Sequence, residues 1–229
     1  MAKPFSFTYS KLKNYEQCPL QHKKVDLDRT PGWEPSGDAI DYGNRVHKAL
    51  HEALSKGTAL PAMLKGLQYW VDWANQLPGE KYVEQKWALD RYYMPTEYFG
   101  SPYIRFNADL AAVHGPVGWL ADWKTGKRLE EPLQLWIGAA IMFAHFSELR
   151  TIDSMFVWLK EDDGMNSAEC ISAEIIHRHD IPSIWDQVGP RVKIYEEACQ
   201  SQTFIPRPGA HCRWCRVQSC EFFGGGPAK

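Results

Sequence analysis

The chain contains 229 residues, of which 44% are hydrophobic and 24% are charged, and its formal net charge is −2. A chain of this size can bury one sizeable core, and its near-neutral charge excludes the strongly basic profile of a protein that coats nucleic acid. The sequence has neither a run of about eighteen apolar residues nor the apolar centre of a signal peptide, so we expect a cytoplasmic protein with no membrane association.

The first predicted elements are helices. Ser10 precedes KLKNYEQC and is expected to cap a helix that ends before Pro19. Residues 42–57 carry apolar side chains at positions 46, 50 and 54 and stop at a glycine, which predicts an amphipathic helix. A further helix is expected over residues 61–76, before the LPGE break. The first third of the chain is therefore expected to be helical.

Strands and helices alternate in the rest of the chain. Strands are predicted over residues 81–89, 103–113, 119–124, 152–160 and 167–177, and helices over 131–149 and 182–200. The second and third strands form a hairpin around HGPVG, and the last two flank the turn EDDGMN. This order predicts an α/β fold with a central mixed sheet flanked by helices.

Two acidic residues face each other in the predicted hairpin. Asp109 precedes the HGPVG turn and Asp122 follows it, so the strands should place the two carboxylates side by side. Lys124 shares a face with Asp122 because side chains alternate along a strand. Paired carboxylates repel each other unless a cation lies between them, and hard oxygen ligands suit Mg²⁺ or Mn²⁺. A lone Asp-x-Lys is more often an ion pair at a strand end, and this alternative stays open.

The motifs around these acids, NADL (107–110) and LADWKTGK (120–127), resemble the paired motif of the PD-(D/E)XK nucleases. They are similar more narrowly to the RecB-type branch, which continues from aspartate through an aromatic residue to Lys-Thr-Gly. The resemblance implies a restriction-endonuclease-like fold. It also implies that Asp109, Asp122 and the main-chain carbonyl of Trp123 hold the metal, with Lys124 as the catalytic lysine.

Histidines on the first long helix fit the same resemblance. GNRVH (43–47) is similar to the family's Gly-x-x-x-His, in which the histidine completes the metal shell or lies beside it. The residues alone leave a core role open, because His47 shares a helical face with Leu50 and Leu54. His51 is expected at the surface or behind the ligands.

Two more polar residues are candidates for the site. Gln134 follows the lysine strand just inside the next helix, as in the family's glutamine motif, which braces the active site and contacts DNA. The tyrosine usual four residues later is Gly138 here, and Trp136 is the aromatic residue available instead. Glu84 lies on the strand before that of Asp109 and is either part of the site or on a solvated strand face.

Four cysteines have the spacing of a metal centre. Cys212, Cys215 and Cys220 form C-x2-C-x4-C, and Cys18 lies near the other end of the chain. The arrangement resembles the 4Fe-4S cluster of the AddB nuclease domain and of CRISPR-associated adaptation nucleases, although their last interval is often five residues. Zinc and four unligated thiols remain alternatives. The other two cysteines, Cys170 and Cys199, are expected in the core.

The resemblance implies one nuclease domain over residues 1–229, in which segments 5–30 and 204–223 form a cluster-bearing appendage. Basic residues beside the cysteines would add a local patch for DNA. We expect a metal-dependent deoxyribonuclease, an exonuclease acting on DNA ends or single strands. One alternative is a non-cutting DNA-binding subunit that joins protein partners in recombination, repair or CRISPR adaptation. Another is a zinc-stabilised interaction module with a chance acidic hairpin.

Overall fold

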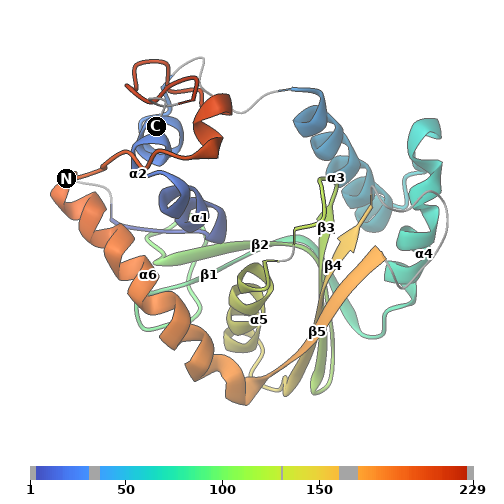
Figure 1. Ribbon diagram of the computed structural model, residues 1–229. Helices are drawn as coiled ribbons and strands as arrows, with labels where there is room; N and C mark the ends of the chain where they lie inside the picture. The colour runs from blue at the N-terminus through green and yellow to red at the C-terminus, as the bar shows by residue number, and fades with distance from the viewer. Residues whose placement is uncertain (1–3, 31–36, 130, 160–169, 226–229) are drawn as a thin grey trace. The chain divides into compact units, whose positions relative to one another are not determined.

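The computed structural model describes residues 4–30, 37–129, 131–159 and 170–225. These residues divide into two compact units (Figure 1). Unit 1 comprises Met1–Ser36 and Trp185–Lys229, and unit 2 comprises Gly37–Ile184. The two ends of the chain thus fold within one unit. The predicted turn EDDGMN (161–166) lies outside the described residues.

A five-stranded mixed sheet forms the centre of unit 2. Its strands follow chain order: β1 (Glu80–Leu89), β2 (Ile104–His114), β3 (Val117–Lys124), β4 (Thr151–Trp158) and β5 (Ile171–His177). Neighbouring strands are antiparallel except β3 and β4, which are parallel because helix α5 (Leu133–His145) carries the chain back between them. The predicted fold class, a central mixed sheet flanked by helices, is confirmed.

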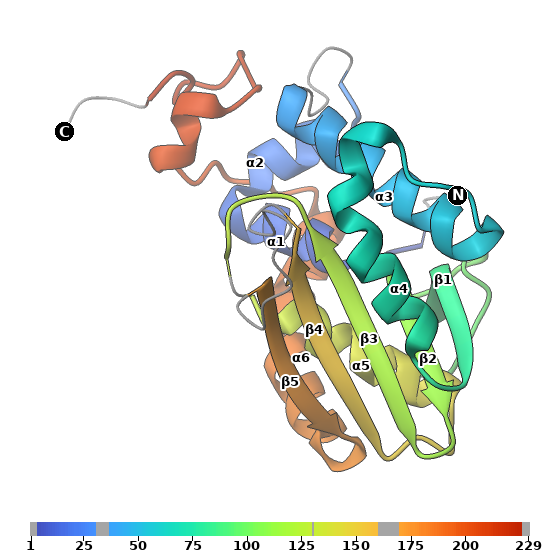
Figure 2. The same cartoon turned by 90° about the vertical axis from the view of Figure 1, so that its right-hand side faces the viewer.

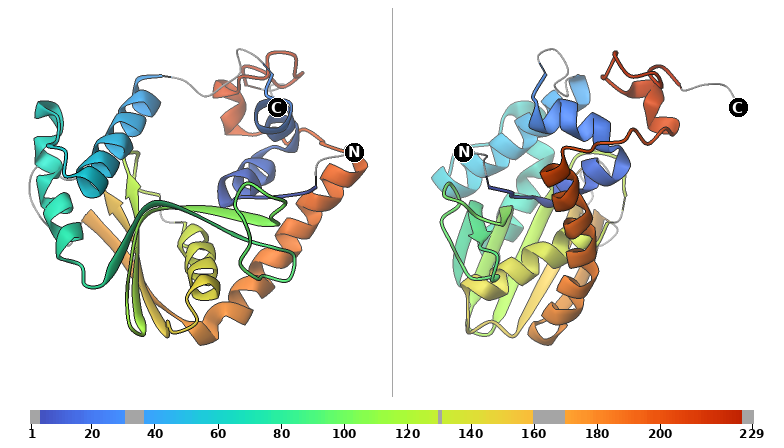
Figure 3. Two further views of the ribbon diagram at one scale, coloured as in Figure 1. Left: turned by 180° about the vertical axis from the view of Figure 1, so that it is seen from behind. Right: turned by 90° about the vertical axis from the view of Figure 1, so that its left-hand side faces the viewer.

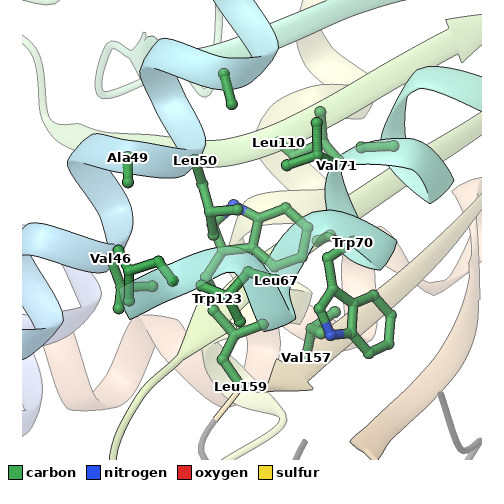
Figure 4. Close-up of a cluster of buried hydrophobic side chains, with 14 of the residues drawn as sticks. Val46, Ala49, Leu50, Leu67, Trp70, Val71, Leu110, Trp123, Val157 and Leu159 are labelled. Atoms are coloured by element: carbon green, nitrogen blue, oxygen red, sulfur yellow. The ribbon is translucent and has the colours of Figure 1, made fainter. Parts of the chain in front are cut away.

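Helices cover both faces of this sheet. On one face lie α3 (Asp38–Lys56), the 3₁₀ turn η2 (Ala62–Leu67) and α4 (Gln68–Gln76), and α5 covers the other face (Figures 1 and 2). Figure 3 shows α5 from behind. Strand alternation sorts the side chains, so that Leu110, Ala121 and Trp123 join the core beneath α3 and α4. In Figure 4, Trp123 lies among side chains of both helices.

The helix ends show how well local patterns predict structure. Helix α3 ends at Gly57, whose φ of 67° is a left-handed conformation that glycine adopts without strain. The predicted N-terminal cap of the first helix was wrong. Helix α1 (Tyr9–Gln17) is capped by Thr8, whose Oγ1 accepts the N–H of Lys11 at 3.2 Å, and Ser10 lies inside the helix.

Unit 1 joins the N-terminal helices to the last long helix. Its elements are α1, α2 (Pro19–His22), the π-helical turn η1 (Lys23–Leu27), the 3₁₀ turn η5 (Ala210–Trp214) and α6 (Ile181–Ser201), which enters this unit at Trp185. Buried His22 lies 2.7 Å from the Tyr195 hydroxyl on α6. Arg191 donates two hydrogen bonds to the carboxylate of Glu16, at 2.6 and 2.5 Å. Side chains therefore hold α1 and α2 to α6. Before α6, Arg178–Asp180 form a short 3₁₀ turn, η4.

Candidate metal and catalytic site

The two predicted acids lie on adjacent strands of unit 2. The last ladder pair between β2 and β3 on this side is Leu110 with Ala121, so Asp109 and Asp122 occupy the next opposed positions. Asp109 Oδ2 accepts the backbone N–H of Trp123 at 2.9 Å. The hairpin therefore places the two aspartates at opposed positions on neighbouring strands.

Lys124 and Gln134 complete a closed network with Asp122. Lys124 Nζ lies 2.5 Å from Asp122 Oδ2 and donates to Gln134 Oε1 at 2.9 Å. The Gln134 amide in turn donates from Nε2 to Asp122 Oδ1 at 2.5 Å. The amide accepts from the cation with one end and donates to the anion with the other, so it holds both side chains in place. Phe156 supports the lysine from β4, with its ring centroid 4.9 Å from Nζ.

His47 reaches the acids from α3. Its Nδ1 lies 3.4 Å from Asp109 Oδ1 and 3.8 Å from Glu84 Oε1, and its side chain is 33% exposed. It lies outside the buried core formed by other residues of the helix, so the geometry favours the ligand interpretation over the core alternative. His51, one turn later, is partly buried and its Nδ1 lies 3.3 Å from Ser55 Oγ.

A glycine allows α3 to approach the end of β3. A Cβ atom on Gly43 would lie 2.9 Å from Thr125 Oγ1, closer than side chains normally pack. Gly43 and His47 are one helical turn apart, so the contact that requires glycine also sets the position of the imidazole. This accounts physically for the Gly-x-x-x-His pattern and for the threonine after Lys124.

Glu84, which the sequence left undecided, belongs to the same group. It has φ = 51° within β1, a left-handed conformation that is rare for a residue with a side chain, and the regular β1–β2 pairing skips it and the opposed Asp109. Asn107 donates to Glu84 Oε2 at 2.6 Å. Sequence patterns did not indicate Asn107 or the backbone irregularity. Such strained residues concentrate at functional sites.

The side chains of this group shift one another's pKa values. Burial lowers the pKa of His47, but hydrogen bonds to Asp109 and Glu84 and the charges of Asp109 and Asp122 outweigh it and raise this pKa to about 10. Burial, followed by the charge of Asp109, raises the pKa of Asp122 above its ordinary value, against the opposing charge of Lys124. Without a bound cation, the imidazolium of His47 is therefore the counter-charge to these carboxylates.

The donor set suits a divalent cation. Among the described residues, ligand atoms of His47, Glu84 and Asp109 lie within 4.8 Å of one another. Asp122 Oδ2 is buried and accepts no hydrogen bond of good geometry from the described residues, although the lysine ammonium lies close to it. Carboxylate oxygens with one imidazole are suitable ligands for Mg²⁺ or Mn²⁺.

Close packing explains why position 138, at which the resembled family usually has tyrosine, is occupied by glycine. A Cβ atom on Gly138 would lie 2.5 Å from Phe106 Cζ and 2.9 Å from Leu120 Cδ2, so α5 packs too closely on the sheet for a side chain there. Trp136 does not replace it, because its indole N–H donates to Glu174 on β5 at 2.7 Å.

A second group of candidate ligands lies in unit 1. The four predicted cysteines line one largely apolar pocket: Cys18, Cys212, Cys215 and Cys220. The backbone N–H of Arg207 points to Cys18 Sγ at 3.5 Å, and that of Gly209 to Cys212 Sγ at 3.4 Å. Burial raises the pKa of the Cys215 thiol, a hydrogen bond from the Val217 backbone opposes this, and the other three cysteines raise it further. Four thiolates here would require a cation to balance their charge.

His211 also lines this pocket, and the sequence analysis missed it. Its Nε2 is buried without a hydrogen-bond partner among the described residues. The sequence feature that could have identified it is its position directly before Cys212 of the C-x2-C pair. Of the two cysteines predicted to be core residues, Cys170 is buried in the core of unit 2, whereas Cys199 on α6 is only partly buried.

Comparisons with known proteins agree with this geometry. Residues 6–104 match the family model described as PD-(D/E)XK nuclease superfamily. The matched segment includes His47 and Glu84 and ends before Asp109, so the arrangement of the acids is an independent observation. No curated protein sequence matches the chain. Among the helices that the structure describes, none is both long and apolar enough to cross a membrane.

A solved structure resembles the chain at the level of the fold. A crystal structure of a protein called "putative exonuclease" from Eubacterium rectale aligns with a TM-score of 0.53 at 12% identity, covering 93% of this chain and 88% of that chain. The crystal structure of SSO0001 aligns with a TM-score of 0.47 at 12% identity, covering 96% of this chain and 87% of that one. The family match covers less than half of the chain, and the alignment with the Eubacterium rectale protein shows a shared fold.

Proposed function

We propose that the chain is a metal-dependent deoxyribonuclease that hydrolyses phosphodiester bonds. The observation that carries this proposal is the convergence of Asp109 and Asp122 from neighbouring strands, with the Lys124 ammonium 2.5 Å from one carboxylate. An ion pair at a strand end needs one acid. It does not account for the second acid, the histidine or the glutamate that the fold brings to the same place.

The residues proposed to hold Mg²⁺ or Mn²⁺ are His47, Asp109, Asp122 and the main-chain carbonyl of Trp123. Bound there, the cation supplies charge stabilisation at a phosphoryl oxygen and lowers the pKa of a water molecule. Asp122 Oδ2 lies 2.5 Å from the Lys124 ammonium, so a cation bound there would share this oxygen with the lysine. His47 contributes only after its imidazolium loses a proton.

Lys124 is the proposed catalytic lysine. Its ammonium orients the attacking water and balances the negative charge that develops on the phosphate. Gln134 is a positioning residue in this proposal, because its amide holds the ammonium through Oε1 and the Asp122 carboxylate through Nε2. It also offers a contact to DNA, as the RecB-type resemblance implies.

The proposed substrate is a DNA end or a single strand, and the proposed activity is exonucleolytic. Support comes from the RecB-type motif LADWKTGK and from the fold shared with the Eubacterium rectale protein called an exonuclease. DNA is thus the proposed partner. The competing proposal, a non-cutting DNA-binding subunit of a recombination, repair or CRISPR-adaptation complex, shares the fold but not the activity of the isolated chain.

The thiol pocket is proposed to hold a 4Fe-4S cluster. Its four cysteines are the ligand set that such a cluster takes. N–H groups aimed at two of the sulfurs and the apolar walls also suit a cluster. Residues 5–30 and 204–223 would then be a cluster-bearing appendage of one nuclease domain, with zinc as the rival ligand.

End-labelled single-stranded and duplex DNA incubated with the purified chain tests the activity. We expect degradation from the ends in Mg²⁺ or Mn²⁺, none with chelator, and none with Asp122→Asn. Asp72→Asn is the matched control, since Asp72 lies on the exposed face of α4 and accepts a hydrogen bond from Gln68 at 2.9 Å. DNA binding without cleavage in either metal would favour the non-cutting subunit. Bound zinc without iron, together with no DNA affinity, would favour the interaction module.

A further inference from the structure

The loop between β1 and β2 displays aromatic rings to solvent. It spans residues 90–103, and in it Tyr92 is 84% exposed and Phe99 is 82% exposed. Large rings are normally buried, because most of their surface is apolar. Neither ring belongs to the buried core of unit 2, so both rings are accessible to a ligand.

The loop has a defined conformation. The carboxylate of Asp90 accepts the backbone N–H groups of Tyr92 at 2.8 Å and Met94 at 3.0 Å. The backbone N–H of Thr96 donates to the carbonyl of Ala88 at 3.0 Å, and that of Tyr103 to Leu89 at 2.9 Å. These bonds fix the backbone while the two rings project outward, so little conformational entropy would be lost when a ligand stacks on them.

Cationic side chains accompany the rings. Lys86 Nζ lies 5.3 Å from the centroid of Phe99 and 5.8 Å from that of Tyr98. The guanidinium of Arg105 lies 5.6 Å from the Tyr98 centroid and donates to the Tyr98 carbonyl at 2.7 Å. Glu97 is an exposed acid on the same loop, whereas the Asp90 carboxylate is directed to the backbone. Rings and cations therefore alternate over a short surface.

This surface adjoins the acid site along the same two strands. Lys86 follows Glu84 by two residues on β1 and pairs in register with Asn107 on β2. Asn107 is the residue that donates to Glu84 at 2.6 Å. A path of neighbouring residues thus leads from the carboxylates to Lys86 and on to Phe99. A flexible strand of nucleic acid can follow such a path, since its phosphates and bases repeat at short intervals.

We propose that the β1–β2 loop binds the unpaired end of a DNA strand that is presented to the acid site. Bases stack on Phe99 and Tyr92, and Lys86 and Arg105 contact phosphates. Alternating rings and cations are the recognition chemistry of single-stranded nucleic acid, whose bases all offer a flat face. This inference rests on the proposed function and specifies its substrate as DNA with a single-stranded end.

The test measures binding and not cleavage. Fluorescence anisotropy follows a labelled oligothymidylate of about 15 nucleotides binding to the Lys124→Ala chain in Mg²⁺, with a blunt duplex as the comparison ligand. In this background, Phe99→Ala and Tyr92→Ala should each raise the dissociation constant for the oligothymidylate about fivefold or more, and should leave that for the duplex unchanged. Phe99→Tyr should keep the parent affinity.

The matched control is Met94→Ala, because Met94 is 60% exposed on the same loop and has no ring. Its variant should bind the oligothymidylate as the parent does. No binding by the parent, or equal binding by the parent and by the Phe99→Ala, Tyr92→Ala double variant, overturns the inference. Equal weakening for single strand and duplex overturns it as well. Ring-dependent binding by a wild-type chain that cuts no DNA supports this inference while refuting the nuclease proposal.

Discussion

The acid site of unit 2 and the thiol pocket of unit 1 are assembled in different ways. Asp109, Asp122 and Lys124 lie on adjacent strands of one sheet, and Gln134 follows shortly after them in the chain. The thiol pocket instead unites Cys18 with three cysteines from residues 212–220. Strand register positions the first set without a ligand. Among the described residues the second set has no such sheet scaffold, and backbone N–H groups of Arg207, Gly209 and Val217 approach its sulfurs.

This difference predicts different dependence on bound metal. Ligands held by a sheet are already arranged, so removing a cation from the acid site should remove activity and leave the fold. Ligands that join distant segments acquire their order partly from the bound group, whose binding energy is then folding energy. Loss of the group from the thiol pocket should therefore loosen unit 1.

Replacement of Lys124 should give the largest change in activity. Lys124→Ala removes the proposed catalytic ammonium and should lower the cleavage rate by about 10²- to 10⁴-fold, the range for a positioned side chain that assists proton transfer. Single-turnover degradation of end-labelled DNA measures the effect. The fold should persist, because Gln134 still donates to Asp122.

Two further variants test whether the loss of activity in Lys124→Ala comes from the loss of its ammonium group. Lys65→Ala changes an exposed lysine on η2 and should leave the rate unaltered. Lys124→Gln keeps a polar side chain of similar reach without the charge and should be as inactive as the alanine variant. Retained cleavage by a folded Lys124→Ala protein would remove the lysine from the chemistry.

A cysteine change should separate the two regions. Cys212→Ser removes one proposed ligand, so bound iron should fall to background and unit 1 should become more sensitive to protease, while Mn²⁺ affinity at the acid site stays unchanged. Elemental analysis, limited proteolysis and calorimetry measure the three effects. Cys199→Ser is the control, since Cys199 lies on α6 and does not line the pocket. Equal iron content in both variants would contradict the cluster proposal.

A substitution on α3 tests how the histidine is positioned. Gly43→Ala places a methyl group 2.9 Å from Thr125 Oγ1, so either the Thr125 side chain rotates or α3 moves, and a movement of α3 would carry His47 with it. We expect Mn²⁺ affinity to fall about 10- to 100-fold, as for losses of groups that orient ligands. Gly189→Ala on α6 meets no atom within 4 Å and should have no effect. Equal affinities of the two variants would show that His47 does not depend on this approach.

The pH dependence of metal binding should be the mildest effect. The neighbouring carboxylates raise the pKa of His47 to about 10, so the metal-free protein keeps this proton throughout the neutral range. A metal that uses the imidazole must displace it, and affinity should therefore rise with pH by up to about tenfold per unit below pH 10. Calorimetry in buffers of different ionisation enthalpy measures the released proton. His47→Asn should release one proton fewer, and an unchanged count would exclude His47 as a ligand.

The sequence predicted the parts of the site that depend on local periodicity. A tight hairpin fixes strand register, so the opposed positions of Asp109 and Asp122 followed from the HGPVG turn. Gln134 lies inside α5 as expected. The position of His47 needed the resemblance, because spacing alone could not separate a ligand from a core residue.

Features of the site that depend on tertiary contacts were not predicted from the sequence. Glu84 joins the group through a left-handed backbone inside β1, which no residue pattern indicated. Trp136 donates to Glu174 on β5, and Gly138 packs against Phe106 of β2; neither contact is visible in the local sequence pattern. The choice of Thr8 over Ser10 as a helix cap is a smaller case, since both residue types are common caps and serine is usually the preferred one.

Anomalous diffraction from crystals grown with Mn²⁺ tests the central claim most directly. The account predicts a manganese peak within coordination distance of carboxylate oxygens from both Asp109 and Asp122, with the imidazole of His47 or the carbonyl of Trp123 among the other ligands. A peak elsewhere, or none at this position under saturating Mn²⁺, would contradict the account.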